Sequence, residues 1–480
     1  MHSKIKIALS ITVLGSILLL SGCLKASDQK YAVNLEIWGV FDDSDSYTGI
    51  LSEFRMINPY IREIKFRKMD INTYRKDLLN AMAAGQGPDI FMIQNNWLPA
   101  FKDKIVSAPE WITGEKEFRD QFADVAADDF LDNGQVYGVP LSIDSLALYY
   151  NKDFLNAEGI AKPPVTWDEL AADVKKLTKV DSYGNIVQQG VAMGTAYNIN
   201  RSTDVLGLLM MQQGSEMFDK QYKTVTFDQS IMIDGKSVNA GEKAMDFYTQ
   251  FARSDSPFYA WNPRSHYSID AFYEGSVAMM LNYSWHAATI ENKNAKLNFA
   301  VAPVPQFNVA KPVDYSNYWG YVVAKNKLSQ SQSGTATTPV SNEVRMSEAW
   351  EFLKFMTYGS NGKFRIMNSV EFMNCLAKKE KNCLANYAKE VAIKIDPAAD
   401  YLEKTSKPAA RRDLLEKQMK DPFLGVFAYG NLIAKSWYQE DSDAIETALA
   451  EAIDSVNNGM ETSSQALTSA ANKINKLIKR

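Results

Sequence analysis

Residues 139–155 read VPLSIDSLALYYNKDFL, and this stretch decides the fold. Its apolar and aromatic centre, residues 146–150, predicts a buried strand. Asp144 is an isolated acid just before that strand, and the sequence of a helix start follows it. We interpret the stretch as the crossing from one lobe of a two-lobed protein into the other.

Strands and helices alternate in the chain before this crossing. The segments 33–38, 64–69 and 90–93 have the pattern of strands, and helical segments separate them. This alternation predicts βαβ units and a largely parallel sheet. Ligands of such sheets bind beyond the carboxyl ends of the strands, where the polar turns 42–47 and 95–97 lie.

The chain after the crossing predicts further turns of the same kind. Thr166 and Glu169 have the spacing of a capping box and predict a helix start. Tyr197 and Trp285 follow predicted strands and precede predicted helices, and Trp437 precedes another helix start. Pro303 and Pro305 make residues 302–307 a stiff connector, which we interpret as a second crossing. We expect a third crossing around residues 365–372.

Length and composition limit the classes of protein. A chain of 480 residues, 46% of them hydrophobic, suggests two globular domains. The 52 basic and 57 acidic residues give a net charge of −5 without long blocks of either sign. This charge pattern argues against a nucleic-acid partner.

The N-terminus has the pattern of an export signal. Lys4 and Lys6 precede an apolar run over residues 7–20, which is short for a membrane span but typical of a signal-peptide core. The run ends in Leu-Ser-Gly-Cys at Cys23, which resembles the lipobox of bacterial lipoproteins. That resemblance implies a signal peptide over residues 1–22, lipid attachment to Cys23, and a tether over residues 23–30.

The other two cysteines, Cys375 and Cys383, have seven residues between them. In an exported chain this even pair predicts a local disulfide. Three histidines and the absence of HExxH or paired CxxC motifs argue against a metal site. We predict no cofactor and no catalytic residue.

Several motifs, taken together, resemble one protein family. They are the lipobox, GQGPDIFMI, the opening stretch with PPVTWDEL, FYEGSVAMMLNYSW, NFAVAPVPQF, YWGYVVAKN and a helical tail. Their order and spacing over residues 31–479 resemble the extracellular solute-binding proteins of sugar ABC importers, the family of maltose-binding protein. The resemblance implies an exported, monomeric, membrane-anchored receptor that delivers a sugar or oligosaccharide to a membrane permease.

The resemblance also implies a fold. This is the α/β, type II periplasmic-binding-protein fold, with two lobes, a mixed sheet flanked by helices in each lobe, and three hinge crossings. We expect the N-lobe to contain residues 31–143 and 310–370, and the C-lobe residues 144–309 and 371–480.

The family's pattern of ligand contacts falls on nine residues of this sequence. They are Asp42, Asp43, Asn95, Asn96, Trp97, Asp144, Tyr197, Trp285 and Trp437. Carboxylates and amides suit the hydroxyl rim of a sugar, and tryptophan rings suit its C–H faces. Maltose-binding protein has a charged pair after its GPDI strand, whereas this chain has Asn95, Asn96 and Trp97. That departure argues against maltose itself as the ligand, but not against a sugar.

Three alternatives stay open from the residues alone. A glycosidase needs only two carboxylates, and Asp42 with Asp144 supplies that number. The adjacent Tyr149 and Tyr150 allow an iron-binding receptor, although neighbours on a strand point to opposite faces. A lipoprotein with an adhesive role and a degenerate cleft is the third alternative.

Overall fold

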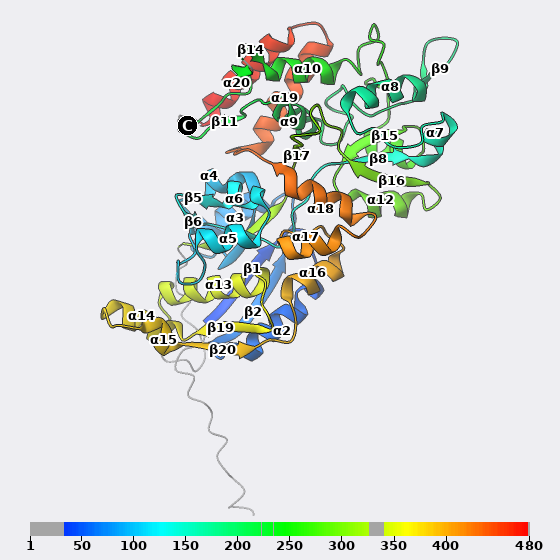
Figure 1. The fold of residues 1–480 in the computed structure, drawn as a ribbon. Helices are drawn as coiled ribbons and strands as arrows, with labels where there is room; N and C mark the ends of the chain where they lie inside the picture. Colours follow the sequence, from blue (N-terminus) through cyan, green and yellow to red (C-terminus); the bar gives the residue numbers. More distant parts are fainter. Residues whose placement is uncertain (1–32, 222, 234, 326–339, 479–480) are drawn as a thin grey trace, which may run out of the picture.

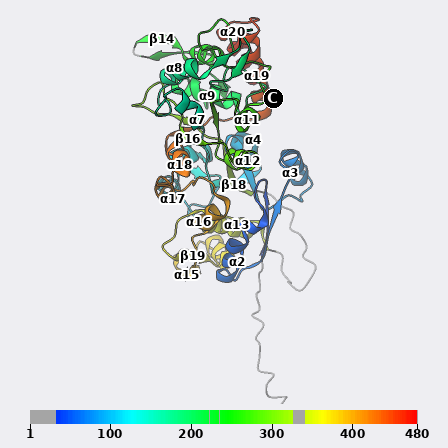
Figure 2. The ribbon, with the colours of Figure 1, turned by 90° about the vertical axis from the view of Figure 1, so that its right-hand side faces the viewer.

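The computed structural model describes residues 33–221, 223–233, 235–325 and 340–478. The chain forms two lobes, each with its own sheet and its own hydrophobic core (Figures 1 and 2). The predicted signal peptide, Cys23 and the tether lie outside the described residues. Within the described ranges, no helix is long and apolar enough to cross a membrane.

The first lobe is built on a six-stranded mixed sheet, in the order β2-β1-β3-β18-β4, with β7 also paired to β18. β1 runs parallel to β2 and β3, whereas β18 runs antiparallel to β3, β4 and β7. The strands are β1 (Val33–Gly39), β2 (Ile61–Lys68), β3 (Ile90–Gln94), β4 (Ile105–Val106), β7 (Val139–Pro140) and β18 (Trp319–Ala324). The sheet therefore joins distant segments of the chain.

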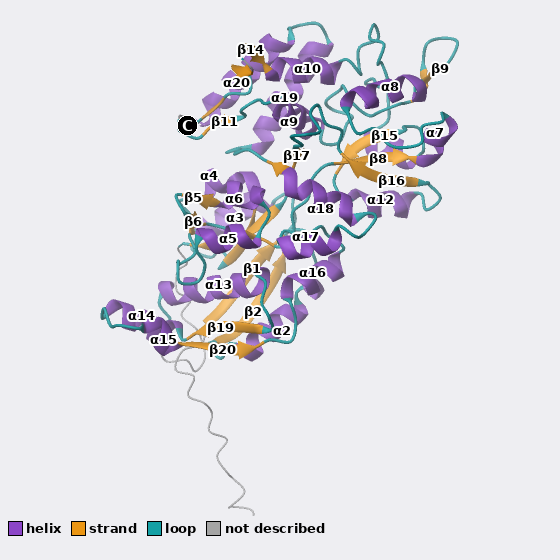
Figure 3. Ribbon diagram, in the orientation of Figure 1, coloured by secondary structure: helices purple, strands orange, loops and turns teal. Residues whose placement is uncertain are grey.

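Helices cover this sheet (Figure 3). They are α2 (Thr48–Ile57), α3 (Tyr74–Ala83), α4 (Leu98–Phe101), α5 (Glu115–Gln121), α6 (Asp124–Phe130), α13 (Asn342–Thr357), α16 (Pro397–Thr405) and α17 (Arg412–Gln418). A buried ion pair fixes α13 to the sheet, since Arg345 Nη1 lies 3.2 Å from Asp89 Oδ1. Asp89 also accepts a hydrogen bond from the Glu36 backbone N–H of β1. The Asp of the GPDI motif thus links the start of β3 to β1 and α13.

The second lobe has a three-stranded sheet in the order β15-β8-β16, antiparallel throughout. Its strands are β8 (Ala147–Asn151), β15 (Met279–Asn282) and β16 (Phe299–Pro303). Its helices are α7 (Lys152–Ala157), α8 (Trp167–Leu177), α9 (Ser202–Gln212), α10 (Ala240–Thr249), α11 (Ser268–Tyr273), α12 (His286–Lys293), α19 (Ser442–Asn457) and α20 (Ser463–Ile478). We expected a mixed sheet here. Both neighbours of β8 run antiparallel to it instead, because the chain between β8 and β15, and then α12, brings β15 and β16 back along opposite edges of β8.

Short two-stranded ladders complete both lobes. They are β5 (Leu131–Asp132) with β6 (Gln135–Val136), β9 (Lys179–Val180) with β10 (Ile186–Gln188), β11 (Phe218–Asp219) with β12 (Thr224–Val225), and β13 (Ser230–Ile233) with β14 (Lys236–Asn239).

Several local predictions are confirmed. Thr166 accepts from the Glu169 backbone N–H while the Glu169 side chain accepts from the Thr166 backbone N–H, which completes the capping box of α8. Tyr149 and Tyr150 both lie on β8. Tyr149 is buried and donates to the Tyr283 carbonyl, whereas Tyr150 is half-buried. The tyrosines therefore pack as strand residues on opposite faces.

The chain crosses between the lobes at three places. The first crossing joins β7 to β8, and the second joins β16 to β18. The third leads from α18 (Leu424–Ile433) to α19. Two short parallel strands, β17 (Asp314–Tyr315) and β21 (Ala434–Lys435), pair where the later two crossings meet (Figure 1).

Side-chain packing shifts two of the expected lobe boundaries. Tyr315 still packs in the second core, whereas Tyr318 packs in the first, so the second crossing lies beyond residue 310. Tyr401 and Leu415 pack in the first core, although we expected residues after 370 in the second lobe. We now propose boundaries near residues 145, 316 and 434.

A small satellite cluster extends from the first lobe. β19 (Lys363–Met367) and β20 (Ala388–Ala392) pair antiparallel, and α14 (Ser369–Ala377) and α15 (Cys383–Tyr387) lie between them in sequence. The predicted disulfide between Cys375 and Cys383 is present. Phe372 of α14 packs against Trp111 with ring centroids 4.6 Å apart. The disulfide thus holds the two short helices together where few core residues are available.

We expect the Cys375→Ala/Cys383→Ala variant to lose about 2–3 kcal/mol of unfolding free energy, because a short closed loop in the unfolded chain becomes open. Urea denaturation with and without a thiol reductant measures this loss. Reduction should destabilise the wild-type chain by a similar amount and leave the variant unchanged. A variant as stable as the oxidised wild type would show that the disulfide adds nothing to folding.

Candidate functional site

The predicted first-lobe residues Asp42 and Asp43 point in different directions. Asp42 accepts hydrogen bonds from Lys407 Nζ, 2.7 Å from both carboxylate oxygens, and from the Tyr401 hydroxyl at 2.7 Å. Asp43 lies 3.0 Å from Lys68 Nζ, and 78% of its side chain is exposed. Since extended neighbours project to opposite sides, only one of the two acids faces the interior of the lobe.

Aromatic rings surround the end of β1 next to Asp42. Phe41 is 45% exposed and meets Trp319 edge to face, with ring centroids 5.5 Å apart. Trp319 in turn meets Trp97 edge to face at 5.0 Å. The first lobe therefore carries an aromatic group beside an ion pair at the carboxyl ends of β1 and β3.

Asn95, Asn96 and Trp97 are buried at the end of β3, and Asn96 and Trp97 contact the chain that follows the third crossing. The Asn96 side-chain amide donates to Gln439 Oε1 at 2.9 Å, and the Asn96 backbone carbonyl accepts from the Gln439 backbone N–H. Trp97 Nε1 donates to Ser442 Oγ at 2.7 Å. These side chains therefore join the lobes in this structure, and Asn96 Oδ1 has no hydrogen-bond partner among the described residues.

Asn95 makes a separate contact with a buried acid. Its amide donates to Asp129 Oδ2 at 3.0 Å, and the Tyr318 hydroxyl donates to the same oxygen at 2.6 Å. The other oxygen of Asp129 accepts from Ser436 on the third crossing. Burial raises the pKa of Asp129 to about 7, and the hydrogen bonds from Ser436, Tyr318 and Asn95 oppose that rise.

Asp144 lies on the first crossing and contacts the second lobe. It accepts from both the hydroxyl and the backbone N–H of Ser284, the residue before Trp285. Burial raises the pKa of Asp144 to about 7, against hydrogen bonds that lower it. The structure thus places this acid between the lobes, next to the turn that carries Trp285.

Trp285 stands at the start of α12 and is 41% exposed. Its ring stacks on Tyr283 with centroids 4.5 Å apart and planes 18° apart. The Arg201 guanidinium lies 5.8 Å from the Trp285 ring centroid and 5.9 Å from that of Tyr283. The Trp285 ring is thereby fixed on one face by Tyr283, and the Arg201 guanidinium lies beside it.

Arg201 is a functional candidate that we did not predict. It has a left-handed backbone (φ 62°) at the start of α9, and its Nε has no hydrogen-bond partner among the described residues. Burial raises the pKa of Asp204, one turn further along, while Arg201 and hydrogen bonds from Tyr283 and Asn317 oppose this rise. Burial, together with the Arg201 charge, lowers the pKa of His286 to about 4. The signal in the sequence was an Arg and an Asp three residues apart, at the start of an otherwise apolar helix.

Asn317 is a second missed residue, on the second crossing. Gln94 Nε2 of β3 donates to Asn317 Oδ1 at 3.0 Å, and the Asn317 backbone N–H donates to the Asp144 carbonyl. It therefore links the end of the first sheet to the Asp144 and Asp204 groups. Its sequence neighbours gave no local signal of this role.

Tyr197 and Trp437 do not join this group. Tyr197 is 66% exposed, and its charged neighbours are Asp454, Glu451 and Lys473 of α19 and α20. Trp437 is 6% exposed and packs in the second core, with its ring centroid 6.3 Å from that of Phe227.

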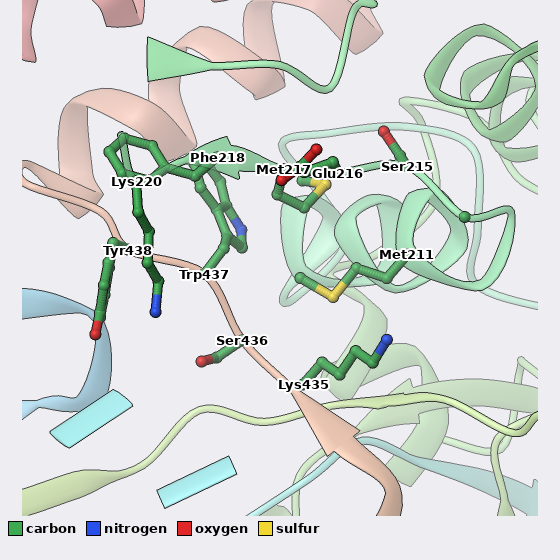
Figure 4. A pocket seen from close by; sticks show the side chains of 11 residues that line it. Met211, Ser215, Glu216, Met217, Phe218, Lys220, Lys435, Ser436, Trp437 and Tyr438 are labelled. Carbon is green, nitrogen blue, oxygen red and sulfur yellow. The ribbon is translucent and has the colours of Figure 1, made fainter. Parts of the chain in front are cut away.

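The Trp437 ring forms one wall of a separate cavity of about 250 Å³, which Met211, Phe218 and Lys435 also line (Figure 4). The neighbouring Tyr438 lies beside Lys220 and donates to the Asp128 carbonyl of the first lobe. We therefore assign Trp437 to packing of the second lobe in this structure.

The site combines aromatic faces with hydrogen-bonding groups fixed by burial. The described ranges contain no group of three or more His, Cys, Asp or Glu side chains arranged to hold a metal ion. This arrangement suits recognition of a polyhydroxylated ligand, since rings cover C–H faces while fixed polar groups meet hydroxyls.

Substitution of Asp129 tests the electrostatics of the crossings. The folded-state pKa of Asp129 is above its unfolded value, so the folded protein holds the proton longer and loses stability as pH rises from about 4 to about 7, with no further loss above that. We expect wild-type stability to fall relative to Asp129→Asn by up to about 1.4 kcal/mol per pH unit in that window. Chemical denaturation at about pH 5, 6, 7 and 8 measures this difference. A constant difference across these pH values would contradict the assignment.

The chain has clear relatives. A family model described as "Bacterial extracellular solute-binding protein" matches residues 63–357. The maltotriose-binding protein of Pyrococcus abyssi is 24% identical over 315 residues, which are 65% of this chain and 59% of that protein. The arabinooligosaccharide-binding protein of Bacillus subtilis is 22% identical over 396 residues, 77% of this chain and 82% of that protein.

A solved structure shows the same two-lobed fold. The cyclic alpha-maltosyl-1,6-maltose binding protein of Arthrobacter globiformis matches with a TM-score of 0.67 and 16% identity, over 93% of this chain and 99% of that one. The predicted α/β, two-lobed periplasmic-binding-protein fold is therefore confirmed. Because the family model covers more than half of the sequence, the chain belongs to the bacterial extracellular solute-binding protein family.

Proposed function

We propose that this chain is the substrate-binding lipoprotein of an ABC importer and captures a sugar or oligosaccharide between its lobes. The observation that carries the proposal is the partly exposed Trp285 ring, fixed by Tyr283 and Arg201 beside Asp144 and Ser284. A rigid ring with hydrogen-bonding groups at its edge matches the face and rim of a pyranose. The site is preorganised, so little conformational entropy is lost on binding.

The three crossings supply the movement that capture requires. Lobes joined by short crossings rotate about them, and a ligand that contacts both lobes favours the closed form. Enclosure excludes water and strengthens each polar contact. The closed form is the state that we propose the permease recognises.

The relatives support a carbohydrate as the ligand. The two sequence relatives are named for maltotriose and arabinooligosaccharide, and the structural relative for cyclic alpha-maltosyl-1,6-maltose. Each of these three ligands is an oligosaccharide. We therefore propose an oligosaccharide for this chain and retain Asp42, Asp144 and Trp285 as contacts, with Arg201 added to them.

The family is extracellular, which fits the export signal predicted from residues 1–22. We propose that cleavage before Cys23 and acylation of its thiol anchor the chain to the outer face of the cell membrane. A monomer is sufficient for this role, since both lobes of the site come from one chain.

The alternatives have less support from the described residues. In a glycosidase, two carboxyl groups flank the bond that is cleaved. Asp42 pairs with Lys407 and Asp144 with Ser284 instead. Tyr149 is buried and donates to a backbone carbonyl, which is unlike an open iron ligand. A broad lack of sugar binding would favour the adhesive lipoprotein.

Calorimetry of the unacylated mature chain with maltotriose, maltotetraose and arabino-oligosaccharides tests the proposal. We expect a dissociation constant of about micromolar for at least one of them, roughly −8 kcal/mol. Thermal denaturation with the same panel should show an increase in apparent stability for the ligand that binds. No heat and no stabilisation across the panel would refute oligosaccharide capture, and released reducing sugar would indicate an enzyme.

We expect Trp285→Ala to weaken binding of that sugar by about 2 kcal/mol, roughly thirtyfold, because the substitution removes the stacked face. Tyr197→Ala is the matched control, since it removes an exposed ring that lies near α19 and α20 instead. Equal affinity of the two variants in calorimetry would remove Trp285 from the site.

We expect Cys23→Ala to abolish incorporation of a labelled fatty acid, because that substitution removes the thiol that carries the lipid. Fractionation of cells should then find the variant outside the membrane fraction. Continued labelling of the variant would place the acyl group elsewhere, and continued membrane retention without labelling would indicate an uncleaved signal anchor.

A further inference from the structure

A group of lysines projects from the satellite cluster of the first lobe. Lys378, Lys379 and Lys381 lie in the loop that the disulfide closes, and Lys389 follows on β20. We call these four residues the lysine tip. Residues 363–394 contain seven basic and three acidic residues in a chain whose net charge is −5. The tip is therefore a local positive region on an acidic protein.

The charges of the lysine tip are open to solvent. All four side chains are exposed. Lys378 lies 4.0 Å from Glu380, and no carboxylate of the described chain pairs with Lys379, Lys381 or Lys389. Leu376, on the same closed loop, is 45% exposed. The tip thus presents unpaired ammonium groups beside an apolar side chain.

The lysine tip is held rigidly on the first lobe. The buried Cys375 and Cys383 pack with Met367 and Phe372 under the loop. The Phe372 ring contacts Trp111, and Arg365 donates to the Trp111 carbonyl at 2.9 Å. A rigid loop loses little entropy when it binds a surface.

The tip lies at the end of the first lobe where the described chain begins. The Val33 backbone N–H, at the start of β1, donates to the Tyr60 carbonyl at 2.8 Å. Next to Tyr60, the Asn58 amide donates to Glu348 of α13 at 2.8 Å. The neighbouring Ser347 hydroxyl lies 3.2 Å from that of Ser369, the first residue of α14. Figures 1 and 2 place β19, α15 and α2 at the same end of the molecule, opposite α8 and α20.

The proposed anchor places a membrane near this end. Nine residues lie between Cys23 and Val33, and the ten residue steps of a fully extended chain span at most about 35 Å. The start of β1 is therefore always within that distance of the bilayer surface. The end of the first lobe that carries the tip is the end closest to the attachment point.

We propose that the lysine tip binds the anionic phospholipid headgroups of the membrane that carries the Cys23 anchor. Each lysine close to such a surface strengthens binding only about fivefold, which is too weak for stable attachment alone but sufficient to orient a chain already anchored by lipid. The tip fixes the first lobe at the bilayer while the second lobe rotates about the crossings. This inference rests on the proposed anchor and is independent of the identity of the sugar.

Vesicle sedimentation of the unacylated mature chain tests the proposal without the anchor. The probe is equimolar phosphatidylglycerol and phosphatidylcholine at low salt, compared with phosphatidylcholine alone. We expect binding only to the anionic vesicles, and we expect added salt to release it. Lys379→Glu/Lys381→Glu should weaken this binding at least about tenfold, because it replaces two attractive charges with two repulsive ones.

Lys293→Glu/Lys296→Glu is the matched control, because both lysines are exposed on the second lobe without a described ion pair. We expect this control to bind anionic vesicles as the wild type does. If both variants bound anionic vesicles equally weakly, the net charge of the chain and not the lysine tip would determine binding, and the proposal would be overturned. Equal binding of wild type to neutral vesicles would overturn it, as would binding of soluble polyphosphate with no binding to vesicles.

Calorimetry with the sugar on the same preparations separates the two proposals. A chain that binds sugar but not anionic vesicles refutes the lipid contact alone. A chain that binds the vesicles through Lys379 and Lys381 but no sugar supports the lipid contact and refutes oligosaccharide capture.

Discussion

Buried aspartates bound to serine hydroxyls hold the crossings between the lobes, and the arrangement of the site depends on them. Asp144 on the first crossing accepts from Ser284, and Asp129 accepts from Ser436 on the third. Asp314 on the second crossing accepts from Ser145 on the first, and burial raises its pKa well above the usual range. A buried carboxyl group without partners is costly, so each acid fixes the position of the hydroxyl that satisfies it.

This polar junction holds the two apolar cores in one orientation and is compatible with the rotation of the lobes that we propose. Apolar packing is dense and resists sliding, whereas a hydrogen bond to a serine is readily replaced by one to water. The junction also leaves little space. A Cβ on Gly430 of α18 would lie 2.2 Å from Ser145 Oγ and 2.6 Å from Asp314 Oδ2. The third crossing therefore passes directly over the first and second.

Local signals in the sequence predicted the elements well. The capping box of α8, the strand β8 around Tyr149 and the Cys375–Cys383 pair each depend on residues close in the chain. The sequence also singled out Asp144 as a residue of the first crossing, because an isolated acid directly before a buried strand is unusual. These features follow from periodicity and spacing, which a sequence displays directly.

The partners of the site residues were not predictable in the same way. Asn96 meets Gln439, which is 343 positions away, and Trp97 meets Ser442. Neither partner carries a local pattern that points to the other. The burial of Trp437 against Phe227 was not predictable for the same reason, since it depends on how the third crossing enters the second core. The structure differs from the expected lobe boundary at residue 370, because α16 and α17 pack in the first core.

The contacts of Asn96 and Trp97 also bear on affinity. A ligand that needs these two side chains must first displace Gln439 and Ser442. Two net hydrogen bonds of about 0.5–1.5 kcal/mol each make that a cost of about 1–3 kcal/mol. Micromolar binding corresponds to roughly −8 kcal/mol. Binding reaches that value only if the ligand replaces both hydrogen bonds with its own, because the displacement would otherwise weaken it. A sugar meets that condition, because its hydroxyl oxygens accept from the Asn96 amide and the Trp97 indole of the first lobe while its hydroxyl protons donate to groups of the second lobe. The junction then selects ligands that contact both lobes at once, which is the requirement for closure.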